Sequence, residues 1–124
     1  MKIVLADREA QLMEVLWEHG PATVTEVRRQ LKDDLAYTTV LTILRNLEGK
    51  GYVGHNGAGR AHRFFARIDR KAAQRNAVRD LAIKLFKGSS ALLLTQLVSD
   101  ETLTDEDVKR IRRLLSQRDK GSKS

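Results

Sequence analysis

The side chains best suited to chemistry lie on one face of a helix predicted over residues 37–49. The apolar residues that recur there at helical spacing, and should face inward, are Val40, Ile43, Leu44 and Leu47. The outward face is then formed by Tyr37, Thr38, Thr39, Leu41, Thr42, Arg45 and Asn46. Hydroxyl groups can bond phosphates or bases, methyl groups can contact the thymine methyl, and an arginine can bond a guanine edge. This face suits DNA, although an ordinary solvated helix face is the alternative.

A second group of candidates is basic and follows this helix. Residues 52–56 and 61–66 have the pattern of two short strands around a Gly-Ala-Gly-Arg turn, which predicts a β-hairpin. Arg60 lies at the predicted tip, and Arg63 and Arg67 follow on the second strand and its exit. Residues 45–71 hold seven Lys or Arg and two Asp or Glu, whereas residues 1–44 hold five and seven. Arg60 and Arg63 are therefore candidates for binding phosphates. A basic turn that only aids solubility is the alternative.

Catalytic and metal chemistry find little support in the sequence. His19, His55 and His62 form no His-x-x-x-His pair, no Ser has the surroundings of a nucleophile elbow, and no Gly-rich loop after a strand would hold phosphate. The chain has no Cys, which excludes disulfides and thiolate metal sites. We therefore expect no enzyme activity, no metal site and no cofactor.

The remaining elements are predicted to be helices. Asp7 is a plausible N-cap for a helix reaching about Glu18, with Ala10 among its inward residues, and Thr25 can cap a second, short helix. Further helices are predicted over residues 69–87 and 90–98 and from Thr104, where Asp107 has the spacing of a reciprocal cap. Residues 119–124 are predicted to fray.

The order of elements predicts the fold class. One Pro, 5% aromatic and 31% charged residues favour a mainly α protein. A helix, a short extended piece, two helices and a hairpin follow one another as in a winged helix-turn-helix, in which the third helix enters the major groove. The net charge of +7 favours a polyanionic partner. Neither a membrane span nor a secretory signal is apparent, so we expect the cytoplasm.

Several segments resemble the penicillinase-repressor family of bacterial transcription factors, which includes the BlaI/MecI type and the copper-responsive CopY branch. They are ATVTEV, LAYTTVLTILRNLEGKGYV, GRAHRFFA, KLFKGS and LTDEDVKRIRRLL, and the likeness spans about residues 5–116. The resemblance implies a winged-helix domain over residues 1–69, a helical dimerisation domain over 70–124, and repression by a homodimer bound to a palindromic operator in a stress or antibiotic response. It places operator contacts on Thr38, Thr39, Leu41, Thr42 and Arg45, and a wing contact on Arg60.

The C-terminal region carries more apolar side chains than three thin helices can hide, which supports dimerisation. The residues expected at the dimer interface are Leu81, Leu85, Phe86, Leu93, Leu97, Ile111, Leu114 and Leu115. The alternative is a monomer in which the fourth helix folds back over the winged domain.

Two departures from the family affect regulation. Antibiotic-responsive members are cleaved at an Asn-Phe bond in the fifth helix, where this chain has Thr95 and Gln96. The copper branch uses a cysteine-rich hook, which this chain lacks. The inducing signal and any sensor or protease therefore stay open. Nonspecific coating of DNA and binding of another protein are the alternative functions.

Overall fold

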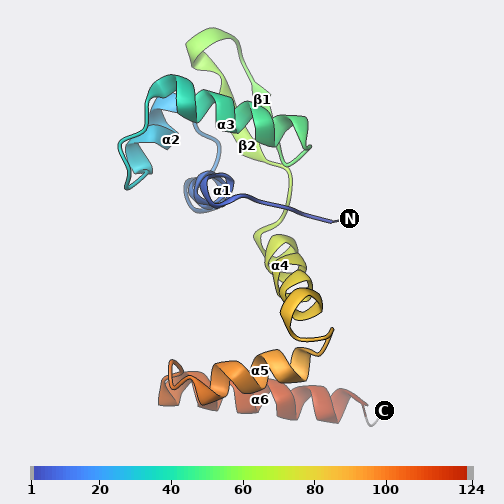
Figure 1. Ribbon diagram of the computed structural model, residues 1–124. Coiled ribbons are helices and arrows are strands. Elements are labelled where there is room, and N and C mark those ends of the chain that lie inside the picture. The colour runs from blue at the N-terminus through green and yellow to red at the C-terminus, as the bar shows by residue number, and fades with distance from the viewer. Residues whose placement is uncertain (1, 123–124) are drawn as a thin grey trace. The chain divides into compact units, whose positions relative to one another are not determined.

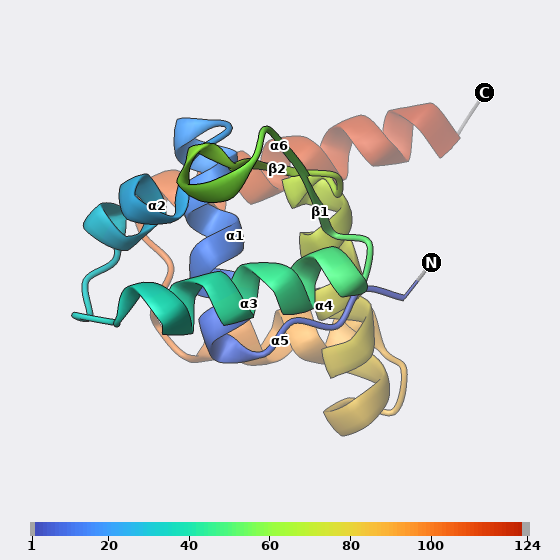
Figure 2. The ribbon, with the colours of Figure 1, turned by 90° about the horizontal axis from the view of Figure 1, so that it is seen from above.

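The computed structural model describes residues 2–122 and forms two compact units, one ending at Val78 and the other beginning at Arg79 (Figures 1 and 2). The elements, in chain order, are α1 (Asp7–His19), α2 (Val24–Gln30), α3 (Tyr37–Gly49), β1 (Val53–Asn56), the 3₁₀ turn η1 (Gly59–Ala61), β2 (Arg63–Ala66), α4 (Arg70–Leu85), α5 (Ser90–Ser99) and α6 (Asp105–Ser122). The division between the units falls within α4. The predicted domains, 1–69 and 70–124, stay a prediction.

The first unit is built from α1, α2, α3 and the β1–β2 hairpin, which pack around one hydrophobic core. Each helix contributes its apolar stripe, and the hairpin contributes one face. The largest fully buried side chains are Phe64, Leu12, Met13, Leu44, Leu47, Val27, Val40 and Val53. On α3 the buried stripe consists of Val40, Leu44 and Leu47, and its burial determines which other residues of the helix face outward.

The start of α1 differs from the sequence prediction. The N-cap is Ala6 and not Asp7, and the carboxylate of Glu9 accepts a hydrogen bond of 2.9 Å from the Ala6 backbone N–H. Glu9 is buried and also accepts a hydrogen bond of 2.7 Å from Lys50 Nζ. Burial alone would raise the pKa of Glu9, but the two hydrogen bonds and the charge of Lys50 together lower it. The inward assignment of Ala10 is also wrong, because Leu12 and Val15 occupy that face and Ala10 is exposed.

The short helix α2 begins earlier than predicted. Thr23, and not Thr25, is its N-cap: Thr23 Oγ1 accepts from the Glu26 N–H at 3.2 Å, and Glu26 accepts from the Thr23 N–H at 3.1 Å. This reciprocal pair is a capping box, which satisfies two backbone donors at once. Val24 is therefore the first helical residue and lies buried in the core.

The hairpin pairs β1 with β2 in antiparallel register, from Val53 opposite Ala66 to Asn56 opposite Arg63. The second strand begins two residues later than predicted, because η1 occupies the turn. Ala22 forms an additional bridge to Phe64, with N–O distances of 2.9 and 2.8 Å. The turn-side half of β2 is thus joined to the segment between α1 and α2.

The second unit contains the C-terminal part of α4, together with α5 and α6. Thr104 and Asp107 cap α6 reciprocally, as predicted, with two hydrogen bonds of 3.1 Å. The predicted fraying is wrong for residues 119–122, which continue the helix, and residues 123–124 lie outside the described part of the chain. Within residues 2–122, α5 and α6 do not form a closely packed pair. No single helix there is long and apolar enough to cross a bilayer; α4 and α5 reach that apolar length only together, across a bend of 93°.

Candidate nucleic-acid interface

Helix α3 presents the predicted polar face to solvent. Its bounds agree with the sequence prediction, and the side chains of Val40, Leu44 and Leu47 are fully buried beneath it. Thr38, Thr39, Thr42, Arg45 and Asn46 are exposed, whereas Tyr37 and Leu41 are half-buried. One side of the helix therefore anchors it, and the opposite side is free to meet a partner.

The exposed side chains on α3 differ in which of their hydrogen-bond donors and acceptors are already used within the protein. Thr42 Oγ1 donates a hydrogen bond of 2.9 Å to the backbone carbonyl of Thr38, one turn earlier. Its hydroxyl proton is therefore used within the helix, and its oxygen remains an acceptor. Arg45 forms no ion pair or hydrogen bond with any side chain among residues 2–122, so its planar donors face solvent without a partner.

The tip of the hairpin meets the beginning of α3. The guanidinium carbon of Arg60 lies over the ring of Tyr37, 4.9 Å from the ring centroid. In Figure 1 the hairpin runs alongside α3 with its turn toward the N-terminal half of the helix. The structure thus brings together two predicted site residues that are 23 positions apart, and no spacing in the sequence indicated their contact.

The second wing arginine has an acidic partner. Arg63 Nη1 lies 3.2 Å from Glu26 Oε1, on the same carboxylate that caps α2. The hydrogen bond from the Thr23 backbone N–H lowers the pKa of Glu26, as do the bond with the Thr23 hydroxyl and the charges of Arg63 and Arg29; partial burial opposes them. Glu26 is not among the residues predicted from the sequence, although the Thr-x-x-Glu spacing of a capping box indicates its contact with Thr23.

A third contact joins the wing to the C-terminal part of α3. Glu48 Oε2 lies 2.5 Å from Nδ1 of His55 on β1, and the His55 and His62 rings are 4.4 Å apart between centroids. Both imidazoles also lie near the buried ring of Phe64. These histidines pack against each other and against Phe64 within the wing, His55 exposed and His62 half-buried. Among residues 2–122, no group of three or more His, Asp or Glu side chains is placed to hold a metal ion.

The predicted dimer residues are not equally accessible in the second unit. Phe86 and Ile111 are half-buried, and Leu93 is buried within the chain. The remaining predicted residues are exposed, namely Leu81, Leu85, Leu97, Leu114 and Leu115. Large apolar side chains that are also exposed there are Ile83, Leu92, Leu94 and Val98. So much exposed apolar surface is unusual for a helical unit of this size.

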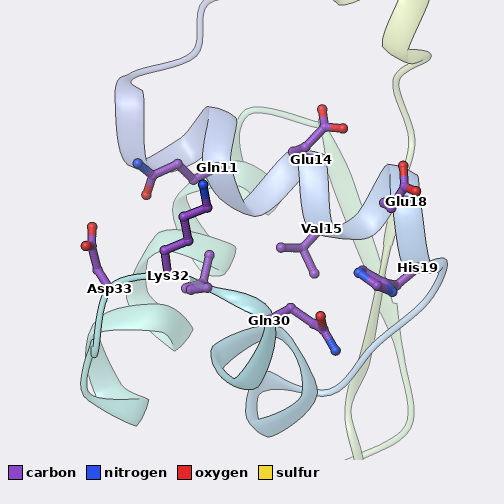
Figure 3. Close-up of a pocket in the computed structure, with 9 residues that line it drawn as sticks. Gln11, Glu14, Val15, Glu18, His19, Gln30, Lys32 and Asp33 are labelled. Carbon is purple, nitrogen blue, oxygen red and sulfur yellow. The ribbon is translucent and has the colours of Figure 1, made fainter.

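One hollow in the first unit lies beside this face of α3, and another lies away from it. One, of about 620 Å³, lies beside Arg45 between the start of α1 and α3 and includes Lys50 on its wall. The other, of about 410 Å³, lies between α1 and residues 30–33 and is shown in Figure 3. Most of the residues that line it are polar or charged, and two of them, Glu14 and Glu18, contact Arg70 at 2.5 and 3.3 Å. It contains none of the predicted site residues.

Three helices with a hairpin held against the third define a winged helix-turn-helix protein. The family model described as penicillinase repressor matches residues 5–117. The chain belongs to this family.

The penicillinase repressor of Bacillus licheniformis is 21% identical over 115 residues, which are 91% of this chain and 90% of the relative. The methicillin resistance regulatory protein MecI of Staphylococcus aureus strain N315 is 17% identical over 116 residues, which are 92% of this chain and 94% of MecI. The transcriptional regulator BlaI of Mycobacterium tuberculosis H37Rv is 43% identical over 63 residues, 48% of this chain and 46% of its own. These proteins are named as regulators and not as enzymes, which agrees with the sequence prediction.

A solved structure has the same fold at low identity. A MarR family protein from Bacillus stearothermophilus superposes with a TM-score of 0.52 and 18% identity, over 98% of this chain and 78% of the other. The predicted fold class, a mainly helical winged-helix protein, is thereby confirmed.

Proposed function

We propose that this chain is a sequence-specific transcriptional repressor that binds a palindromic DNA operator as a homodimer. The observation that carries the proposal is the joined surface of α3 and the wing. The exposed Thr38, Thr42 and Arg45 recur on one side of α3, and Arg60 of the wing lies over Tyr37 at its start. A helix face of hydroxyl, methyl and guanidinium groups with a basic wing beside it matches the requirements of a major groove and its flanking phosphates.

The side chains divide by role. Arg45 has unused donors in a planar fork, which suits the O6 and N7 edge of guanine. Thr38, Thr39, Leu41 and Thr42 supply methyl groups and hydroxyl oxygens for neighbouring bases or phosphates. Arg60 supplies a phosphate or minor-groove contact from the wing. Arg63 contributes less charge to DNA than its position suggested, because Glu26 at 3.2 Å already pairs with it.

Homodimerisation is proposed from the second unit. Exposed Leu85, Leu97, Leu114 and Leu115 would be covered by the same surface of a second copy, as in an isologous interface. Two copies related by a two-fold axis would place two α3 helices on two half-sites of one palindrome. Leu93 is already buried within one chain and would support the interface from beneath.

The proposed setting is a stress or antibiotic response of the BlaI/MecI kind, in the cytoplasm where the operator lies. Thr95 and Gln96 occupy the cleavage position of the family's antibiotic-responsive members. Thr95 Oγ1 bonds the Ala91 carbonyl within α5 at 2.8 Å. We therefore propose that repression is ended by a signal other than cleavage of an Asn-Phe bond.

The test is selection of random duplex DNA by the purified full chain at about 150 mM salt, followed by sequencing of the bound pool. A two-fold symmetric motif, with preference over random DNA of several kcal/mol, is expected. Binding with a steep salt dependence but no enriched motif would replace the proposal with nonspecific coating. Negligible binding would favour a protein-interaction module. Sedimentation equilibrium of the free protein tests the dimer separately.

A further inference from the structure

We propose that Tyr37 is a positioning residue for the wing: its ring holds the Arg60 guanidinium at the start of α3, so that helix and wing meet DNA as one preformed surface. This inference rests on the proposed function, which assigns both elements to DNA. It differs from a direct contact between Tyr37 and DNA, because Tyr37 would act through Arg60.

The tip of the wing has little else to fix its position. The backbone hydrogen bonds recorded within it join Ala61 to Ala58 and His62 to Gly59, both inside the turn. Gly57 and Gly59 have positive φ values of 89° and 59°, and every residue from 57 to 61 is exposed. The contacts that secure the hairpin, the Ala22–Phe64 bridge and the Arg63–Glu26 pair, lie at the start of β2 and hold this strand, not residues 57–61 of the turn. The stack of Arg60 on Tyr37 therefore joins the turn to the body of the unit.

Tyr37 is suited to hold a cation from one side only. Its ring is half-buried and packs against the hydrophobic core, so the ring itself is anchored. The guanidinium carbon of Arg60 at 4.9 Å is within the range of a cation–π contact, in which the negative ring face attracts the cation. An exposed contact of this kind shifts an equilibrium about two- to fivefold, which is enough to bias the position of the turn but not to lock it.

The stack leaves the chemistry of Arg60 available. A guanidinium directs its N–H donors outward in its own plane, whereas an aromatic ring contacts its face. Arg60 can thus lie over Tyr37 and donate to a phosphate at the same time. Holding the turn beforehand removes part of the ordering cost that a mobile wing would incur when it binds.

The test is a double-mutant cycle on the selected operator, with wild type, Tyr37→Leu, Arg60→Ala and the double variant. Tyr37→Leu should weaken binding about 5- to 30-fold, the range expected for loss of one exposed cation–π contact in each of the two subunits. Arg60→Ala should weaken it more, because the phosphate contact is lost too. The double variant should bind like Arg60→Ala alone, since the ring acts only through the guanidinium. Tyr37→Phe keeps the ring and removes the hydroxyl, and it should bind like wild type.

Additive effects in the cycle, or a Tyr37→Phe variant as weak as Tyr37→Leu, would overturn the proposal and assign Tyr37 a contact of its own with DNA. A second measurement needs no DNA. Backbone ¹⁵N relaxation of residues 57–61 in the free protein should show greater picosecond–nanosecond motion in Tyr37→Leu and in Arg60→Gln, but not in Tyr37→Phe. Unchanged motion in Arg60→Gln, an exposed position that does not threaten folding, would refute the stack as the restraint. If the wild-type protein selects no DNA motif, the proposed function is wrong. The relaxation measurement would still test whether Tyr37 restrains Arg60, because it needs no DNA.

Discussion

Replacing Arg45 with Ala isolates the contribution of the outward face of α3. The side chain is exposed and has no ion pair or hydrogen bond with another side chain of residues 2–122, so the free energy of unfolding should change by less than about 0.5 kcal/mol. A lost bidentate contact to guanine costs ~1–3 kcal/mol in each half-site. A dimer on a full palindrome would lose both contacts, ~2–6 kcal/mol in all, or roughly 30-fold or more in the dissociation constant.

The assay compares operator binding at fixed salt on three duplexes: the palindrome, a hybrid with one half-site scrambled, and random DNA. Arg75→Ala is the matched control, because Arg75 is exposed on α4 of the same unit and its loss changes the net charge equally. Arg45→Ala should lose about twice as much free energy on the palindrome as on the hybrid, with relaxed preference at one position of each half-site. The control should lose little on any duplex.

An equal loss of binding free energy on the palindrome and on random DNA would refute a base contact by Arg45. That result, together with a salt slope lower by about one per subunit, would make Arg45 a phosphate contact. A lower melting temperature for Arg45→Ala would show that the side chain supports the fold, contrary to its exposed position.

Three further predictions concern assembly, pH and capping. Leu85→Asp should shift the protein toward monomers and weaken operator binding through lost avidity, and a variant still fully dimeric at micromolar concentration in sedimentation would contradict the interface proposed for Leu85. Because the folded-state pKa of Glu9 is lowered, its stabilisation is present above the unfolded value of about 4.3 and is lost as pH falls through the folded value. Urea denaturation of Glu9→Gln should therefore show lower stability than wild type at pH 7 and a smaller difference at pH 3; a constant difference would exclude this linkage. Thr23→Ala should cost ~1 kcal/mol by removing the N-cap of α2, measured against Thr25→Ala, whose exposed side chain caps nothing.

Local patterns in the sequence were enough to locate the candidate interface. The apolar period of residues 40–47 defined both the bounds of α3 and its outward face, because a buried stripe on a helix leaves one arrangement for the rest. The Gly-rich basic turn indicated the wing, and Thr104 with Asp107 indicated the start of α6. Thr25 was the wrong cap because two threonines compete there, and only Thr23 has Glu three residues later.

The sequence by itself determined the class of fold, the polar face of α3 and the basic wing, since each depends on neighbours within a few residues. Only the tertiary structure decided which of those groups are already engaged. It placed Arg60 over Tyr37, paired Arg63 with Glu26 and left Arg45 without a partner, through contacts between elements far apart in the chain. Helical and strand periods report which side of an element is buried, but they contain no information on which distant side chain lies opposite.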